Sequence, residues 1–260
     1  MAKQPVDGGR GKGSGSPKVT PKRNQSGFYR VLGLVGAAAA VLLIYQFTKP
    51  EASLSSKIDP SVPLPAATGY SIGKADAPVR VIEFADFECP GCGQFFSLTE
   101  PDVRSRLVDS GLVRYTYMDL PLPMHPNTWS ASNAAACANE QGKFWEMHDA
   151  LFTAQDQWNG FATKRPKGKM KEFAQQIGLD VSKWEDCFDG QKFLPNIKAH
   201  EMEAIRQGAS STPTFIIGTR RVANAISYDK FRAYVDTALA EARAAAPAAP
   251  AGDSAAKKGA

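Results

Sequence analysis

The sequence Val-Ile-Glu-Phe-Ala-Asp-Phe-Glu-Cys-Pro-Gly-Cys at residues 81–92 decides the fold. The β-branched and aromatic run Pro78–Ala85 predicts a short buried strand. From Gly91 to about Ser110 the apolar spacing becomes helical, with a kink expected at Pro101. The stretch therefore predicts a strand that leads directly into a helix, with two cysteines at the start of that helix.

Strand and helix patterns continue on the C-terminal side of this stretch. Four further elements are predicted: a strand at Leu112–Leu120, a hairpin of Thr214–Ile217 and Arg221–Ile226 around Gly218, and a helix at Tyr228–Arg243. Between them the patterns are helical, near 128–140, 143–154, 167–177 and 181–206. This order predicts an α/β sheet covered on both faces, with an inserted helical subdomain at about 125–208.

The two ends of the chain differ in composition from the centre. Residues 1–27 are expected to be disordered, and residues 28–47 are long and apolar enough for a transmembrane helix. A cleaved signal peptide is the alternative, but the sequence after residue 47 lacks the small residues of a cleavage site. Residues 48–68 are expected to form a linker and 244–260 a disordered tail, which leaves 69–243 as the folded domain.

The positive charge of the chain is concentrated at its N-terminus. The 260 residues carry a net charge of +5, but seven basic residues and one acid within residues 1–30 give that segment +6. Residues 31–260 therefore carry −1, which excludes a generally basic nucleic-acid-binding surface on the folded part. The positive-inside rule predicts a cytoplasmic N-terminus and an exported domain from about residue 50 onward.

All four cysteines, Cys89, Cys92, Cys137 and Cys187, lie on the predicted exported side, where an even number suggests disulfides. A cysteine at a helix N-terminus has a lowered pKa, and its thiolate is the reactive form in disulfide exchange. Cys89 is expected to be exposed and to react first. Cys92, one turn along and more buried, resolves the mixed disulfide, and Pro90 suits the first helical position.

The Cys-x-x-Cys pair has two other interpretations. A structural zinc site needs four ligands, and His125, His148 and His200 show no ligand spacing with the remaining cysteines. An inert structural disulfide is the second alternative. The pattern favours a redox site, with no metal and no cofactor beyond the redox-active disulfide.

These residues resemble the DsbA-like thiol–disulfide oxidoreductases, a branch of the thioredoxin fold. Residues 81–92 resemble the active-site strand and helix start of that family, and Ser210–Phe215 resembles its Thr-Pro loop. Residues 136–148 resemble its helical insert. The resemblance covers about 75–243 and implies a thioredoxin-like fold with an inserted helical subdomain, preceded by a single N-terminal transmembrane helix.

The resemblance also implies roles for individual residues. Cys89 matches the nucleophile and Cys92 its partner, while Pro213 matches the cis-proline beside them. Thr212 is expected to bind an extended client peptide through its backbone, although an ordinary turn before a strand is the alternative. Glu83 matches a buried acid that relays a proton from Cys92, although a solvent-facing glutamate stays open because alternation does not fix its face.

Two further features bear on the redox chemistry. Gly91 stands where strongly oxidising family members often carry His, so the reduction potential is left open. Some exported relatives carry a second disulfide in the helical insert, which implies a Cys137–Cys187 pair, with two buried free thiols as the alternative.

The sequence therefore predicts a bacterial, membrane-tethered oxidase in the periplasm or its equivalent. It would donate the Cys89–Cys92 disulfide to folding exported proteins with free cysteines, and a membrane partner of the DsbB or VKOR type would reoxidise it. A disulfide reductase or isomerase, and a binding module with a structural disulfide, are the alternatives.

Overall fold

The computed structural model describes residues 25–48, 58–59 and 61–245. The chain divides into two units, Met1–Pro50 and Glu51–Ala260. The first unit holds α1 (Gln25–Thr48), which contains an apolar span at Gly27–Tyr45 long enough to cross a membrane. The expected membrane segment at residues 28–47 lies within α1. Most of the two predicted disordered tails, and much of the predicted linker, lie outside the described residues.

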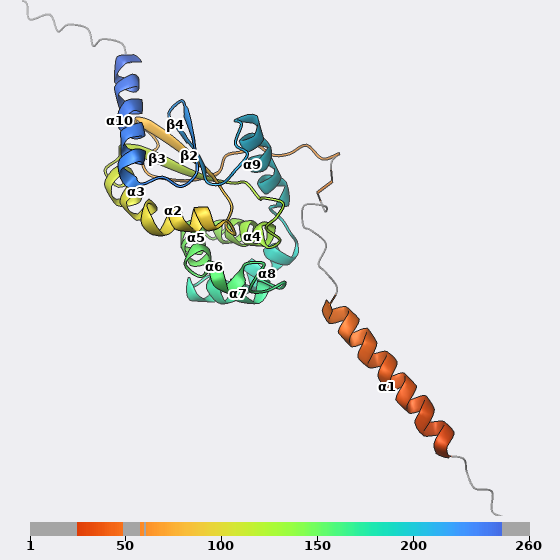
Figure 1. Ribbon diagram of the computed structural model, residues 1–260. Coiled ribbons are helices and arrows are strands. Elements are labelled where there is room, and N and C mark those ends of the chain that lie inside the picture. Colours follow the sequence, from red (N-terminus) through yellow and green to blue (C-terminus); the bar gives the residue numbers. More distant parts are fainter. Residues whose placement is uncertain (1–24, 49–57, 60, 246–260) are drawn as a thin grey trace, which may run out of the picture. The chain divides into compact units, whose positions relative to one another are not determined.

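A mixed five-stranded sheet forms the centre of the second unit (Figure 1). Its strands lie in the order β1 (Tyr70–Ile72), β3 (Val113–Asp119), β2 (Val79–Ala85), β4 (Thr214–Ile217) and β5 (Arg220–Ala223). Only β2 and β3 are parallel; the other neighbouring pairs are antiparallel. The central position of β2 explains its nearly continuous apolar run, because helices cover both faces there. The edge strand β1 was not predicted, since three residues are too short to show a period.

The helical segment after β2 is not the single kinked helix that was expected. It consists of α2 (Pro90–Leu98), α3 (Glu100–Val103) and the π-helical turn η2 (Arg104–Val108). The break falls at Thr99, whose φ of −125° is not helical. Pro101 explains the break, because its backbone nitrogen carries no hydrogen to donate to the preceding turn and its ring clashes with that turn.

Two hydrophobic clusters cover the two faces of the sheet. On one face Val81 and Phe215 pack with Phe95 of α2 and Phe231 of α10 (Tyr228–Ala245). On the other face Phe84 and neighbouring side chains pack against Ala204 of α9 (Leu194–Arg206). The thioredoxin-like α/β fold that was predicted is confirmed by this arrangement.

The inserted helices α4 to α8 lie together on one side of the sheet in Figure 1. They are α4 (Thr128–Asn139), α5 (Phe144–Thr153), α6 (Gln155–Trp158), α7 (Lys167–Gln176) and α8 (Val181–Asp189). Their buried side chains form one cluster with Phe87, Cys92 and Tyr117, so the insert packs directly against the Cys-x-x-Cys region.

Two predicted boundaries in this region were wrong. The single helix expected at 181–206 is divided into α8 and α9, because Gln191 has a left-handed φ of 53° between them. The second hairpin strand ends at Ala223 rather than Ile226, because Asn224 has a φ of 72° and turns the chain away.

Candidate active site

The two cysteines of the Cys-x-x-Cys pair lie at the start of α2, one turn apart. Cys89 caps the helix and Pro90 occupies its first turn. Both thiols are free, and Cys89 is 8% exposed while Cys92 is 1% exposed. Cys89 is thus more covered than the sequence suggested. The loop before β4 shields part of the Cys89 side chain from solvent, since Cys89 Sγ lies 3.5 Å from the Thr212 carbonyl oxygen.

The environment separates the acidities of the two thiols. The pKa of Cys89 is lowered to about 5, chiefly by the hydrogen bond with the Cys92 side chain. Burial opposes this shift, whereas hydrogen bonds from the Thr212 side chain and from the backbone N–H groups of Cys92 and Gly91 add to it. Burial, together with the hydrogen bond to Cys89, raises the pKa of Cys92 well above its usual range. Near neutral pH, Cys89 is therefore a thiolate and Cys92 a thiol, which suits the first for nucleophilic attack and departure.

The Thr212–Pro213 loop lies directly against the cysteine pair. The peptide bond between these two residues is cis, as the resemblance implied. A β-carbon added at Gly91 would lie 3.4 Å from Pro213 Cδ and 3.6 Å from Cys89 Sγ, so the loop and the helix start are in contact. The buried Thr212 hydroxyl has no hydrogen-bond partner besides the Cys89 thiol among residues that the structure describes, and this contact favours the Cys89 thiolate.

Glu83 faces inward from β2 rather than toward solvent. Its side chain is 2% exposed, and Oε2 accepts a 2.5 Å hydrogen bond from the Tyr115 hydroxyl. Burial first, and the charge of Glu100 second, raise the pKa of Glu83 to about 8, although Tyr115 and Arg104 oppose the shift. Its charge in turn raises the pKa of Cys92. Glu83 can therefore carry a proton at neutral pH close to the buried cysteine.

Sequence reasoning missed two acids that hold the turn between β2 and α2. The Asp86 carboxylate accepts hydrogen bonds from the Glu88 N–H (2.7 Å), the Leu122 N–H (2.8 Å) and His125 Nδ1 (2.8 Å). The Glu88 carboxylate accepts hydrogen bonds from Asn127 N–H (2.7 Å) and the N–H of residue 160 (2.5 Å). Both acids lie within the sequence that decides the fold, and their position beside Cys89 was the available signal.

Gln155 of the helical insert also contacts the active-site turn. Its amide donates hydrogen bonds to the carbonyl oxygens of Phe87 (2.7 Å) and Cys89 (3.0 Å). The first bond pairs the Phe87 carbonyl oxygen, and the second adds to the 3.1 Å hydrogen bond that the Cys89 carbonyl oxygen accepts from the Gly93 N–H. The insert therefore helps to hold Cys89 in place.

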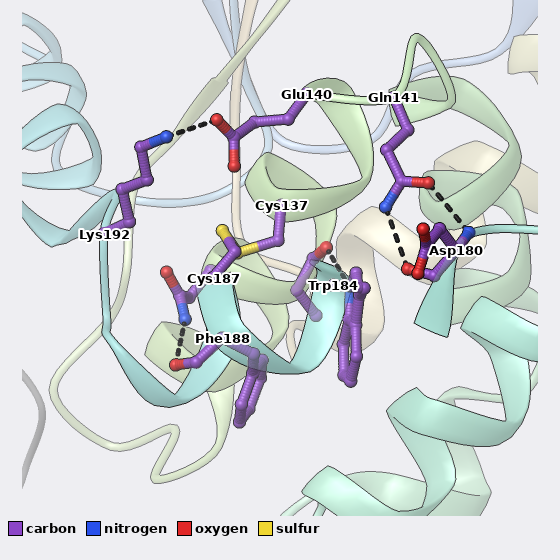
Figure 2. Close-up of a disulfide and its surroundings, with 10 residues drawn as sticks. Cys137, Glu140, Gln141, Asp180, Trp184, Cys187, Phe188 and Lys192 are labelled. Atoms are coloured by element: carbon purple, nitrogen blue, oxygen red, sulfur yellow. Dashed lines mark hydrogen bonds and ion pairs between the residues drawn. A yellow bond between two sulfur atoms is a disulfide. The ribbon is translucent and has the colours of Figure 1, made fainter. Parts of the chain in front are cut away.

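The other two cysteines form a disulfide that joins α4 to α8 (Figure 2). The Cys137–Cys187 bond has a sulfur–sulfur distance of 1.99 Å and closes a separation of 50 residues. Around it Trp184 donates a 3.1 Å hydrogen bond to the Ala134 carbonyl oxygen, and Lys192 pairs with Glu140. The first contact joins α4 to α8, and the second joins the residue after α4 to the segment that follows α8.

One cluster has the residue types of a metal site. Glu100, His148 and Asp149 have possible ligand atoms within 4.8 Å of one another. The Arg104 guanidinium already hydrogen-bonds to Glu100 (2.7 Å), Asp149 (2.9 Å) and His148 (3.2 Å). A metal ion would have to displace this cation, so the cluster is better described as a partly buried ion-pair network.

Comparison with known proteins places the chain in a family. A family model described as thioredoxin matches residues 66–237. The chain belongs to the thioredoxin family. The structure is similar to that of α-DsbA1 from Wolbachia pipientis, with a TM-score of 0.61 and 21% identity, covering 70% of this chain and 96% of that one. At this identity the likeness shows the fold alone, and it confirms the predicted DsbA-like form of the thioredoxin fold.

Two relatives by sequence have very different names. Disulfide bond formation protein D of Bacillus subtilis is 25% identical over 175 residues, which are 65% of this chain and 76% of that protein. The Na(+)/H(+) antiporter NhaA 3 of Salinispora tropica is 37% identical over 187 residues, 72% of this chain. That match spans only 27% of the antiporter, so the similarity carries no transport activity to this chain. The first relative and the fold together support the predicted membership of the DsbA-like thiol–disulfide oxidoreductases.

Proposed function

We propose that this thioredoxin-family protein is an exported, membrane-tethered thiol oxidase that donates its Cys89–Cys92 disulfide to folding proteins. The observation that carries the proposal is the difference between the pKa values of the two thiols, which makes Cys89 a stabilised thiolate and Cys92 a buried thiol. A stabilised thiolate favours the reduced state of the pair, so the disulfide is a strong oxidant.

The exchange proceeds in two steps. A client thiolate attacks Cys89 Sγ, the Cys89–Cys92 bond breaks, and Cys92 leaves as a thiolate that takes a proton from Glu83. A second client thiolate then attacks the client sulfur of the mixed disulfide and expels the Cys89 thiolate. The client loses two electrons and gains a disulfide, and the protein gains those two electrons as a dithiol.

Client binding is assigned to the loop before β4. The backbone of Thr212 lies against Cys89 and offers hydrogen bonds to an extended peptide, in the manner of an added strand. Pro213 packs beside Gly91 and shapes the surface on which the peptide lies. Because backbone recognition ignores client sequence, it suits an enzyme with many unrelated substrates.

The apolar helix α1 is proposed to anchor the protein in the cytoplasmic membrane, with its basic N-terminus in the cytoplasm. The folded domain would then act in the periplasm or its equivalent. A membrane partner of the DsbB or VKOR type would accept the two electrons from the reduced pair. Anchoring would keep the protein close to such a partner.

A reductase remains a second candidate because Gly91 supplies no charged side chain beside Cys89. Equilibration of the full chain in detergent with glutathione buffers measures the Cys89–Cys92 potential. We expect a value well above about −200 mV, and a value near the −270 mV of a thioredoxin would exclude the oxidase. Cys89→Ser should abolish oxidation of a reduced client, whereas a binding module would be unaffected by it.

A further inference from the structure

The loop that contains His125 is clamped onto the turn that carries Cys89. At one end Asp86 Oδ2 accepts hydrogen bonds from Leu122 N–H and His125 Nδ1, both at 2.8 Å. At the other end Glu88 Oε2 accepts a 2.7 Å hydrogen bond from Asn127 N–H. His125 lies between Leu122 and Asn127, whose N–H groups are both held, and its own ring is bound by Asp86, so the imidazole is fixed relative to the active-site turn.

The same turn positions Cys89. The Asp86 carbonyl oxygen accepts a 3.0 Å hydrogen bond from the Cys89 N–H, three residues along. One buried residue therefore binds the imidazole through its side chain and the reactive cysteine through its backbone. The His125 side chain is 17% exposed, whereas the Asp86 carboxylate is fully buried. A buried carboxylate at 2.8 Å favours the charged form of the ring.

We propose that the His125 imidazolium, held by Asp86, supplies the positive charge that stabilises the Cys89 thiolate of the reduced protein. The inference rests on the proposed redox function and explains how a Cys-Pro-Gly-Cys pair obtains a cation without a charged residue between its cysteines. The histidine comes from a loop more than thirty residues further along the chain rather than from position 91.

The electrostatic environment of His125 agrees with this role. The hydrogen bond from the ring to Asp86 raises the pKa of His125 above its usual range, burial opposes the shift, and the charges of Asp86, Cys89 and Glu88 add to it. Among the described residues, those three groups have the largest electrostatic effect on the ring. Because coupling is reciprocal, a thiolate that raises the pKa of His125 has its own pKa lowered equally by the imidazolium.

The test is a titration of the Cys89 thiolate, followed by ultraviolet absorbance, in the reduced full chain in detergent. His125→Gln keeps a hydrogen-bond donor for Asp86 but removes the charge. We expect the pKa of Cys89 to rise by about half to one unit in this variant, since an opposite charge nearby shifts a pKa by about that much or more. The equilibrium constant for oxidation of glutathione should fall about three- to tenfold.

Two matched variants separate charge from structure. Lys74→Gln removes one exposed cation from the turn before β2, whereas Cys89 follows the other end of this strand, which is about 20 Å long, so the pKa of Cys89 should stay unchanged. Gly91→His, introduced into the His125→Gln protein, should lower the pKa again, because a side chain at position 91 starts 3.6 Å from Cys89 Sγ.

An unchanged pKa of Cys89 in folded His125→Gln protein would overturn the inference while leaving the oxidase proposal intact. An ordinary cysteine pKa in the unmodified chain would instead contradict the oxidase proposal. If His125→Gln does not fold, NMR of the unmodified chain decides, since it contains only three histidines. The His125 ring should titrate at higher pH in the reduced than in the oxidised protein, and equal values would refute the coupling.

Discussion

The Tyr115 hydroxyl donates a 2.5 Å hydrogen bond to the Glu83 carboxylate, and the two residues lie on the neighbouring parallel strands β3 and β2. Both are almost completely buried, beside a second buried acid, Glu100. Burial first, and the charge of Glu100 second, raise the pKa of Glu83 to about 8, although the Tyr115 hydrogen bond opposes the shift. A single carboxyl is thereby kept protonated near neutral pH within electrostatic reach of Cys92, which would need a proton when it leaves the disulfide in the proposed exchange.

Glu83→Gln should slow the oxidation of a reduced client peptide about ten- to a hundredfold at pH 7, because the departing Cys92 thiolate loses its proton donor. Stopped-flow measurement of mixed-disulfide formation checks this rate. Glu146→Gln, at an exposed glutamate on α5, is the control and should react at the normal rate. Equal rates for the two variants would remove Glu83 from the mechanism.

The same substitution should change the pH dependence of stability. Below the unfolded value of about 4.5 the Glu83 carboxyl is protonated in both states and has no effect. As pH rises from there to about 8, the unfolded chain ionises first, so the folded state loses stability. Glu83→Gln should therefore match the unmodified protein at pH 4 and exceed it by about 2–4 kcal/mol at pH 8 in urea unfolding. A gain that does not depend on pH would contradict this account.

The lowered pKa of Cys89 has the opposite effect on how stability depends on pH. In the reduced protein the folded state releases the Cys89 proton near pH 5, whereas the unfolded chain holds it until about pH 9. Folded reduced protein should therefore gain stability, relative to reduced Cys89→Ala, as pH rises from 5 to 9. Denaturant unfolding of the two reduced proteins at several pH values measures this difference. A difference that stays constant with pH would show that the thiolate is not stabilised by folding.

The sequence was informative where the relevant contacts are local. Cys89 and Pro90 follow a strand and begin a helix, and this order alone placed a reactive thiol at a helix N-terminus. Glu83 shows the limit of the same reasoning, since alternation along a strand does not say which face is covered. Only the packing of α2, α3 and α10 on that face decided that the glutamate is buried.

Contacts between distant segments could not be predicted. Asp86 binds Leu122 and His125, and Glu88 binds Asn127, across separations of 36 to 39 residues. No period or motif in the sequence predicts these hydrogen bonds, because they depend on how the insert packs on the sheet. The Cys137–Cys187 pair is similar, since spacing alone gave no partner and only the family resemblance implied one.

Removal of the second disulfide should lower stability without changing the redox chemistry. Replacing both Cys137 and Cys187 with Ala should cost about 3–4 kcal/mol in urea unfolding, as expected for a closed loop of 50 residues. The Cys89–Cys92 potential should stay the same, because the removed bond joins α4 to α8. Mass mapping of the unreduced protein should first find the two cysteines linked. Free thiols at both positions would refute the pair.

Adding a single methyl group at Gly160 should disturb the active-site turn. A β-carbon there would lie 2.4 Å from Pro126 Cγ and 2.8 Å from Glu88 Oε1, so the loop and the Glu88 clamp would have to move. Gly160→Ala should destabilise the protein by about 1–3 kcal/mol and weaken the hold on the turn beside Cys89. Gly168→Ala is the matched control, because that helical glycine has no atom within 4 Å of the added carbon and the change should be neutral or slightly stabilising. Equal stability of the two variants in urea unfolding would show that the loop around Gly160 can move without loss of stability.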